Sequence, residues 1–126
     1  MSESLKTIEL DFTSLKFYEC FVVSTMHDGI VFNKKLCQKM IDTCLNNFSD
    51  KPFIYIANRR NDYNVDPTVY LRLGDYPNFK GIAIVDKVKS STNLPQFEKK
   101  FTNFPFEVFN ELDEAFNWAE DIIKKK

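Results

Sequence analysis

Hydrophobic and polar residues alternate at the start of the chain with the period of a β-strand. Ile8, Leu10 and Phe12 are each separated by one polar residue, which is the spacing of a half-buried strand. After a turn, an apolar run over residues 16–26 predicts a second strand that returns beside the first. A third, short extended piece follows at residues 30–32. The N-terminal part of the chain is therefore expected to form an antiparallel β-hairpin.

The period changes to that of an amphipathic helix after residue 33. Apolar residues recur at helical spacing over about four turns, and polar side chains occupy the other side. Asn33 stands just before them and is a suitable N-cap, because its side-chain oxygen can accept a hydrogen bond from a backbone N–H of the first turn. The apolar stripe consists of Leu36, Cys37, Met40, Ile41, Cys44, Leu45 and Phe48.

Three later apolar segments predict buried strands. Residues 53–57 and 81–85 are continuous apolar runs, as expected for strands that are covered on both faces. Residues 106–109 predict a last strand. Between the first two, Asp66 is a suitable N-cap with proline at the next position, and it begins a short helix that ends at Gly74.

Two further helices complete the pattern. One is indicated by Leu94, Phe97 and Phe101. The last has Asn110 and Asp113 in the spacing of a capping box, acidic residues in its first turn and lysines in its last, as the helix dipole favours. Its apolar stripe consists of Leu112, Ala115, Phe116, Ala119, Ile122 and Ile123.

This order of elements predicts the fold class. A hairpin followed by β-α-β-α-β-α-β-α, with about four helices, implies an α/β sandwich with a largely parallel sheet and right-handed crossovers. No repeat, low-complexity tract or linker divides the chain, so residues 1–126 are expected to form a single domain.

Composition narrows the possible partners and location. The formal net charge is −1 and the pI about 5.8, so no overall field attracts nucleic acid. The three cysteines form no CxxC pair, and no apolar run is long enough to span a bilayer. The N-terminus lacks the apolar core of an export signal. We expect a cytoplasmic protein with reduced thiols, either a monomer or a homodimer.

The residue inventory argues against the common catalytic and cofactor sites. His27 is the only histidine, and no nucleophile-elbow sequence accompanies it. Three isolated glycines allow neither a P-loop nor a dinucleotide fingerprint. Cys37 and Cys44 lie on the apolar stripe of a helix and are interpreted as core residues, and Cys20 as a buried strand residue. We therefore expect no enzyme, no cofactor and no metal site.

One loop, residues 58–67, is chemically unusual. It leaves the carboxyl end of a predicted parallel strand, the edge at which open α/β sheets bind their ligands. It combines exposed arginines with a tyrosine and asparagines, which suit recognition of a protein surface. An alternative stays open, in which asparagines build turns and an arginine ties the loop to the fold. The predicted partner-binding residues are Asn58, Arg59, Arg60, Asn61, Tyr63 and Asn64.

A weaker candidate lies on the same edge. Residues 86–93 follow the other buried strand and contain lysines and hydroxyls, which suit an anion or a phosphorylation site. An ordinary solvated loop is the alternative. The hydroxyl residues concerned are Ser90 and Ser91, together with Thr68 in the first turn of the helix after the unusual loop.

Taken together, these segments resemble a known family. Gly29 before the run 30–32, the cluster Asn-Arg-x-Asn-x-Tyr from Asn58, and the runs 81–85 and 112–118 are similar to the SpoIIAA-like branch of the STAS fold, in particular its small flavobacterial members. The resemblance covers nearly the whole chain and implies a non-enzymatic module that binds proteins. Some relatives bind nucleotides or hydrophobic ligands. In the anti-sigma-factor antagonists a serine in the matching turn is phosphorylated; here that turn contains no serine.

The leading hypothesis is thus a non-catalytic cytosolic interaction or regulatory module of STAS-like type that binds a protein partner at residues 58–67. The alternative is a carrier or sensor of a small hydrophobic ligand or lipid, motivated by the 13 phenylalanines.

Overall fold

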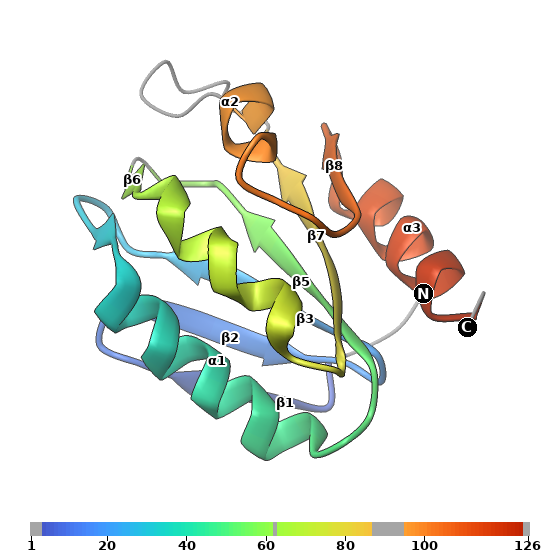
Figure 1. The fold of residues 1–126 in the computed structure, drawn as a ribbon. Coiled ribbons are helices and arrows are strands. Elements are labelled where there is room, and N and C mark those ends of the chain that lie inside the picture. Colours follow the sequence, from blue (N-terminus) through green and yellow to red (C-terminus); the bar gives the residue numbers. More distant parts are fainter. Residues whose placement is uncertain (1–3, 62, 87–94, 125–126) are drawn as a thin grey trace.

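The computed structural model describes residues 4–61, 63–86 and 95–124. Within these residues a six-stranded sheet has strands in the order of the chain, β1-β2-β3-β5-β7-β8 (Figure 1). The first two pairs of neighbours are antiparallel and the other three are parallel. The strands are β1 (Lys6–Glu9), β2 (Thr13–Phe17), β3 (Phe21–Met26), β5 (Phe53–Asn58), β7 (Phe79–Val85) and β8 (Phe106–Phe109).

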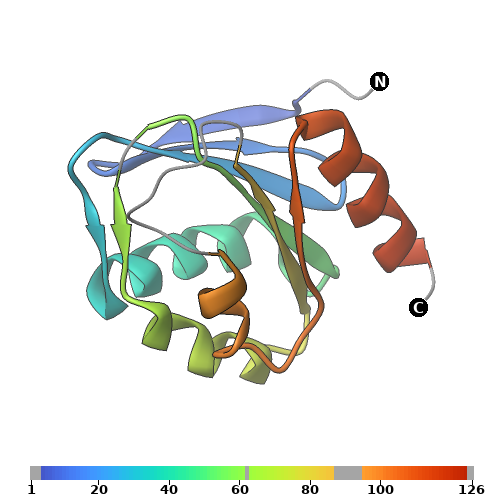
Figure 2. The ribbon, with the colours of Figure 1, turned by 90° about the horizontal axis from the view of Figure 1, so that it is seen from above.

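Helices cover both faces of this sheet. The helix α1 (Lys34–Phe48), the 3-10 helix η1 (Pro67–Asp75) and the short helix α2 (Pro95–Lys99) lie on one side, and α3 (Leu112–Lys124) lies on the other (Figure 2). The predicted fold class is confirmed: an α/β sandwich with antiparallel N-terminal strands, a largely parallel sheet and helical crossovers. None of the helices in the described residues has the length and apolarity needed to cross a membrane.

Two hydrophobic cores follow from the two covered faces, and β5 supplies side chains to both. Phe53, Tyr55 and Ala57 belong to the core on the side of α1 and η1, whereas Ile54 and Ile56 belong to the core under α3. All five are at most 3% exposed. The predicted strand at residues 53–57 is therefore buried on both faces, as its continuous apolar run indicates.

The helix starts on the α1 side form as predicted. Asn33 Oδ1 accepts a hydrogen bond from the backbone N–H of Leu36 at 3.1 Å, and Asp66 Oδ1 accepts one from Thr68 at 3.1 Å. The helix after Asp66 is a 3-10 helix and continues one residue beyond Gly74. The residues of α1 that are buried against the sheet are Cys37, Met40, Ile41, Cys44 and Phe48.

The N-terminal strands differ from the prediction. The run over residues 16–26 is two strands, because the chain reverses at residues 18–20 and Phe17 pairs with Val22. The backbone N–H of Tyr18 bonds to the carbonyl of Phe21 at 2.8 Å. Cys20 is thus a half-buried turn residue and not a buried strand residue. The turn contains no Gly, Pro, Asn or Asp, so neither composition nor period indicates it.

Two smaller differences concern capping and pairing. At the start of α3 the capping carboxylate is Glu114 and not Asp113: Glu114 Oε1 accepts from the backbone N–H groups of Asn110 (3.3 Å) and Glu111 (3.2 Å). Part of the predicted loop 58–67 is also a short strand. It is β6 (Asn64–Val65), which pairs in parallel with β4 (Val31–Phe32) in a separate two-stranded sheet.

Gly81 lies where the chain before β8 approaches β7. A Cβ added to Gly81 would lie 2.8 Å from the carbonyl oxygen of Pro105. That oxygen accepts the backbone N–H of Ile82 at 2.9 Å, so it cannot move away without loss of a hydrogen bond. A Cβ on Gly74 would instead meet the side chain of Asn103, which is exposed and can rotate.

We therefore expect Gly81→Ala to lower the free energy of unfolding by about 1–3 kcal/mol, as for other overpacked sites. Gly74→Ala, the matched control, should change it by less than about 0.5 kcal/mol, as for ordinary surface positions. Urea unfolding of both variants measures the difference, and equal costs at the two glycines would contradict the close approach at Pro105.

Two of the three thiols are core residues, as predicted. Cys37 and Cys44 are buried beneath α1, and burial raises the pKa of each thiol from the ordinary 9.0 to about 12. Between these values the thiols stay neutral in the folded protein and ionise in the unfolded chain. The unfolded state then binds fewer protons, so stability must fall as the pH rises through this window.

We expect the free energy of unfolding to decrease above about pH 9, with the two thiols contributing a slope of up to about 2.7 kcal/mol per pH unit. The variant Cys37→Ala/Cys44→Ala should lose the part of this slope that begins near pH 9, although its stability at neutral pH is lower. Urea unfolding at a series of pH values tests this; an unchanged slope in the variant would show that the thiols do not titrate differently in the two states.

Candidate functional site

The candidate site lies at the carboxyl edge of the parallel strands. β3, β5, β7 and β8 run in the same direction, so all of them end at this edge. The predicted recognition loop leaves it from β5, which lies between β3 and β7. Beyond the last residue of β5, the backbone N–H of Arg59 still bonds to the carbonyl of Val85 on β7 at 2.9 Å. The strand geometry therefore extends at least to Arg59.

This geometry separates the two arginines. Side chains alternate along a strand, so Arg59 follows Tyr55 and Ala57 to the face that carries α1, η1 and α2. Asn58 follows Ile54 and Ile56 to the face that carries α3. Arg59 is only 3% exposed, whereas Arg60 is exposed. The expectation that both arginines face a partner is therefore wrong for Arg59.

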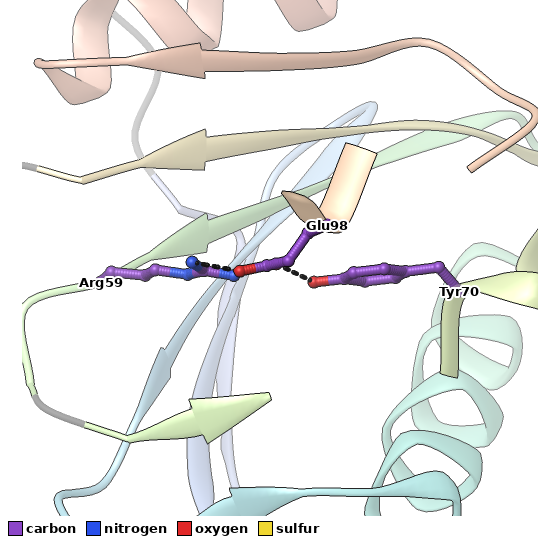
Figure 3. A network of polar contacts seen from close by, with 3 residues as sticks. All are labelled: Arg59, Tyr70 and Glu98. Atoms are coloured by element: carbon purple, nitrogen blue, oxygen red, sulfur yellow. Dashed lines mark hydrogen bonds and ion pairs between the residues drawn. The ribbon is translucent and has the colours of Figure 1, made fainter. Parts of the chain in front are cut away.

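Arg59 forms a buried ion pair with Glu98 on α2. Its Nη1 and Nη2 atoms donate to Oε2 and Oε1 of Glu98 at 2.8 and 2.5 Å, the two-pronged geometry that arginine makes with a carboxylate. Tyr70 on η1 donates its hydroxyl to Glu98 Oε1 at 2.8 Å. Figure 3 shows the three side chains in a row: Arg59 from the residue after β5, Glu98 from α2 and Tyr70 from η1. The cluster thus ties both helices to the sheet edge.

Three further features belong to this buried cluster. The ring of Tyr63 lies beside the guanidinium, with 5.9 Å between its centroid and Arg59 Cζ. Asp86, the residue after β7, is buried at the same edge, and its charge acts on Tyr63. The Nε atom of Arg59 is also buried, and it has no hydrogen-bond partner within the described part of the chain.

Burial determines the charge states of the cluster. It would lower the pKa of the Arg59 guanidinium, but the hydrogen bonds that Arg59 donates to Glu98, together with electrostatic interactions with Tyr63, Tyr70 and Glu98, raise that pKa above its ordinary value. Burial raises the pKa of Tyr70 well above its usual range, and the charge of Glu98 adds to the shift. Arg59 therefore stays charged at physiological pH, and Tyr70 stays a protonated donor.

On the opposite face, a cavity of about 440 Å³ opens beside Arg60. It is bounded by the ends of β5 and β7 and by the start of α3. Apolar side chains meet amide, carboxylate and guanidinium groups there. Its lining residues are Asn58, Arg60, Val85, Asn110, Glu111 and Leu112.

The remaining predicted site residues have local roles or lie outside the description. Asn61 donates its side-chain amide to the carbonyl of Met26 at 2.8 Å and so holds the turn against the end of β3. Asn64 is exposed on β6. Thr68 bonds through its hydroxyl to Asp66 Oδ1 at 2.7 Å, which reinforces the start of η1. Ser90 and Ser91 lie outside the described residues.

Sequence reasoning missed Glu98 and Tyr70, and it included Asp86 only as the first residue of the weaker candidate segment 86–93. A signal for Glu98 was present: it falls four residues after Leu94 and one after Phe97, on the apolar stripe of its predicted helix. A carboxylate at such a position needs a buried cationic or hydrogen-bonding partner. The described residues contain no cluster of three or more His, Cys, Asp and Glu side chains that could hold a metal ion.

No protein-family model, curated protein or solved structure matches this chain. The resemblance to the SpoIIAA-like branch of the STAS fold thus stays a prediction, and a functional proposal has to come from the geometry of the carboxyl edge.

The different burial of the two arginines gives a direct test by stability. Arg59→Ala leaves the Glu98 carboxylate buried without its cation, and we expect it to cost about 3–5 kcal/mol. Arg60→Ala, the matched neighbour, should stay within about 0.5 kcal/mol of the wild type. In urea unfolding, Arg59→Ala/Glu98→Ala should cost less than the sum of its two single variants. Similar stabilities for the two arginine variants would contradict the ion pair.

Proposed function

We propose that this protein is a non-catalytic interaction module, of the STAS-like type that its sequence resembles, and that it binds a protein partner at the cavity beside Arg60. The observation that carries the proposal is the position of this cavity. It lies at the carboxyl ends of β5 and β7, the edge at which α/β sheets bind ligands.

The lining of the cavity suits a segment of polypeptide. The exposed guanidinium of Arg60 offers a fork of donors for a carboxylate. The amide of Asn58 can both donate to and accept from peptide groups. Val85 and Leu112 supply apolar surface between these polar groups. Peptide segments present this same combination of carboxylate, amide and apolar groups.

The buried cluster around Arg59 contributes indirectly. It fixes the backbone that leaves β5, so Asn58 and Arg60 are held at the mouth of the cavity on a rigid strand end. Side chains on such a support lose less conformational freedom when they bind. Arg59 is accordingly a positioning residue in this proposal, while Arg60 makes the contact.

The alternative expectation, a carrier of a small hydrophobic ligand, receives less support. Such a carrier needs a mainly apolar pocket. Four of the six residues that line the cavity at the carboxyl edge carry polar or charged groups, namely a guanidinium, a carboxylate and two amides. The phenylalanines that motivated the alternative are largely engaged in packing, as in the stacked rings of Phe48 and Phe53, whose centroids are 4.5 Å apart.

Charge reversal at the cavity tests the proposal. The tagged protein and its Arg60→Glu variant are used to enrich binding proteins, and the recovered partner is titrated by calorimetry. We expect Arg60→Glu to weaken binding at least about tenfold, because a carboxylate replaces the cation at the contact. Arg72→Glu is the matched control, since Arg72 is an exposed arginine beside α1, at the groove between α1 and η1.

Circular dichroism of both variants establishes that they are folded. If a partner binds Arg60→Glu as tightly as it binds the wild type, the cavity is not the binding site and the proposal is wrong. If Arg72→Glu weakens binding as much as Arg60→Glu does, the partner does not recognise the cavity specifically. The contact then lies elsewhere, or binding depends only on the net charge of the protein.

A further inference from the structure

A groove between α1 and η1 is lined by two cations and by no carboxylate. It contains a cavity of about 70 Å³, and its floor is apolar and buried. Polar side chains form the walls: Lys34 and Gln38 come from α1, Arg72 from η1, and Tyr76 from the residue that ends η1. The floor residues are Cys37, Ile41, Val69 and Leu73.

The two cations lie at the same level of this groove. α1 and η1 run side by side in the same direction (Figure 1), and Gln38 Nε2 donates to the hydroxyl oxygen of Tyr76 at 3.4 Å. Lys34 lies four residues before Gln38, about 6 Å at the rise of an α-helix. Arg72 lies four residues before Tyr76, about 8 Å at the rise of a 3-10 helix. Both positive charges are therefore about one turn from the same hydrogen bond and face each other across the groove.

Neither charge is balanced within the described part of the chain. Lys34 and Arg72 are exposed and form no ion pair there. The first turn of α1 contains no acidic residue. The carboxylates that follow on the two helices, those of Asp42 and Asp75, do not line the cavity, and that of Asp42 accepts from Gln38 at 2.9 Å. Because like charges across a groove repel each other, an anion between them is favoured.

Size and charge select the kind of anion. About 10–15 Å³ of such space holds one water molecule, so the cavity suits a group of roughly five non-hydrogen atoms. A phosphate group has this size, and as a monoester it carries a charge of about −1.5 to −2 at pH 7, which matches two cations. The hydroxyl oxygen of Tyr76 accepts from Gln38, so its proton can be donated to a phosphate oxygen.

We propose that the groove between α1 and η1 binds the phosphate group of a phosphate monoester between Lys34 and Arg72, with the hydroxyl of Tyr76 as a further donor. A free phosphate ester and a phosphorylated side chain of a polypeptide share this chemistry. The groove lies on the α1 face of the sheet and the cavity beside Arg60 on the α3 face, so this proposal does not rest on the proposed function.

Removal of each cation provides the first test. Glycerol 3-phosphate is titrated into the protein, and the NMR shifts of the backbone amides of α1 and η1 measure binding. We expect Lys34→Gln and Arg72→Gln each to weaken binding at least about tenfold, because each loses one charge-assisted hydrogen bond. Lys39→Gln and Arg60→Gln are the matched controls: they remove exposed cations that do not line the groove, and they should bind as the wild type does.

A set of peptides distinguishes the two sources of phosphate. A short blocked peptide is compared with glycerol 3-phosphate in three forms, with phosphoserine, serine or glutamate at its central position. Tighter binding of the phosphoserine peptide assigns the groove to a phosphorylated polypeptide, and equal or weaker binding assigns it to a free ester. The serine and glutamate peptides should bind at least about tenfold more weakly than the phosphate probe that binds best, because they offer no doubly charged group.

Circular dichroism establishes that all four variants are folded, as expected for exposed positions. The proposal is overturned if no phosphate probe shifts the amides of the groove, or if Lys34→Gln and Arg72→Gln bind as the wild type does. Equal losses in Lys39→Gln and Arg60→Gln would overturn it as well, since binding would then depend only on net charge. A glutamate peptide that binds as tightly as the phosphate probes would show that the groove does not select phosphate, and would also overturn it.

Discussion

A strand that is covered on both faces leaves no solvent side for its side chains, and this constraint on β5 organises the whole carboxyl edge. Alternation sends successive residues to different cores, and the same alternation continues past the last residue of the strand. Arg59 is therefore carried under α2 and η1, where only a buried carboxylate can balance its charge. Asn58 is directed to the other face, where α3 begins. Two neighbouring polar residues thereby belong to different sites.

Local signals were sufficient for most of the fold. The helix starts at Asn33 and Asp66, the apolar stripe of α1 and the two continuous apolar runs were all read correctly from the sequence, because caps and periodicity act within a few residues. The reversal at residues 18–20 was not, since aromatic and apolar side chains there continue the pattern of a strand. Likewise, nothing local distinguishes β6 from a loop. Its pairing with β4 depends on a partner more than thirty residues earlier.

The candidate site was only partly predictable for a related reason. Its place at the end of a central parallel strand followed from the order of elements, but the direction of each side chain depends on what covers the strand. Arginine in a polar loop is usually a surface residue. The partner that changes this, Glu98, is 39 residues away, and its position on an apolar helical stripe was the one local indication. The structural alternative, in which an arginine ties the loop to the fold, describes Arg59. A role in recognition is proposed for Arg60 alone.

The agreement between strand order and chain order has a consequence for how the molecule is built. Each strand of the main sheet joins the strand that precedes it in that sheet, so an emerging segment always finds its template already synthesised. The antiparallel strands at the N-terminus make short-range contacts, which form quickly. The later parallel strands are added one at a time to a growing edge, and β8 closes the series. A domain of this kind is suited to assembly on the ribosome from its first residues onward.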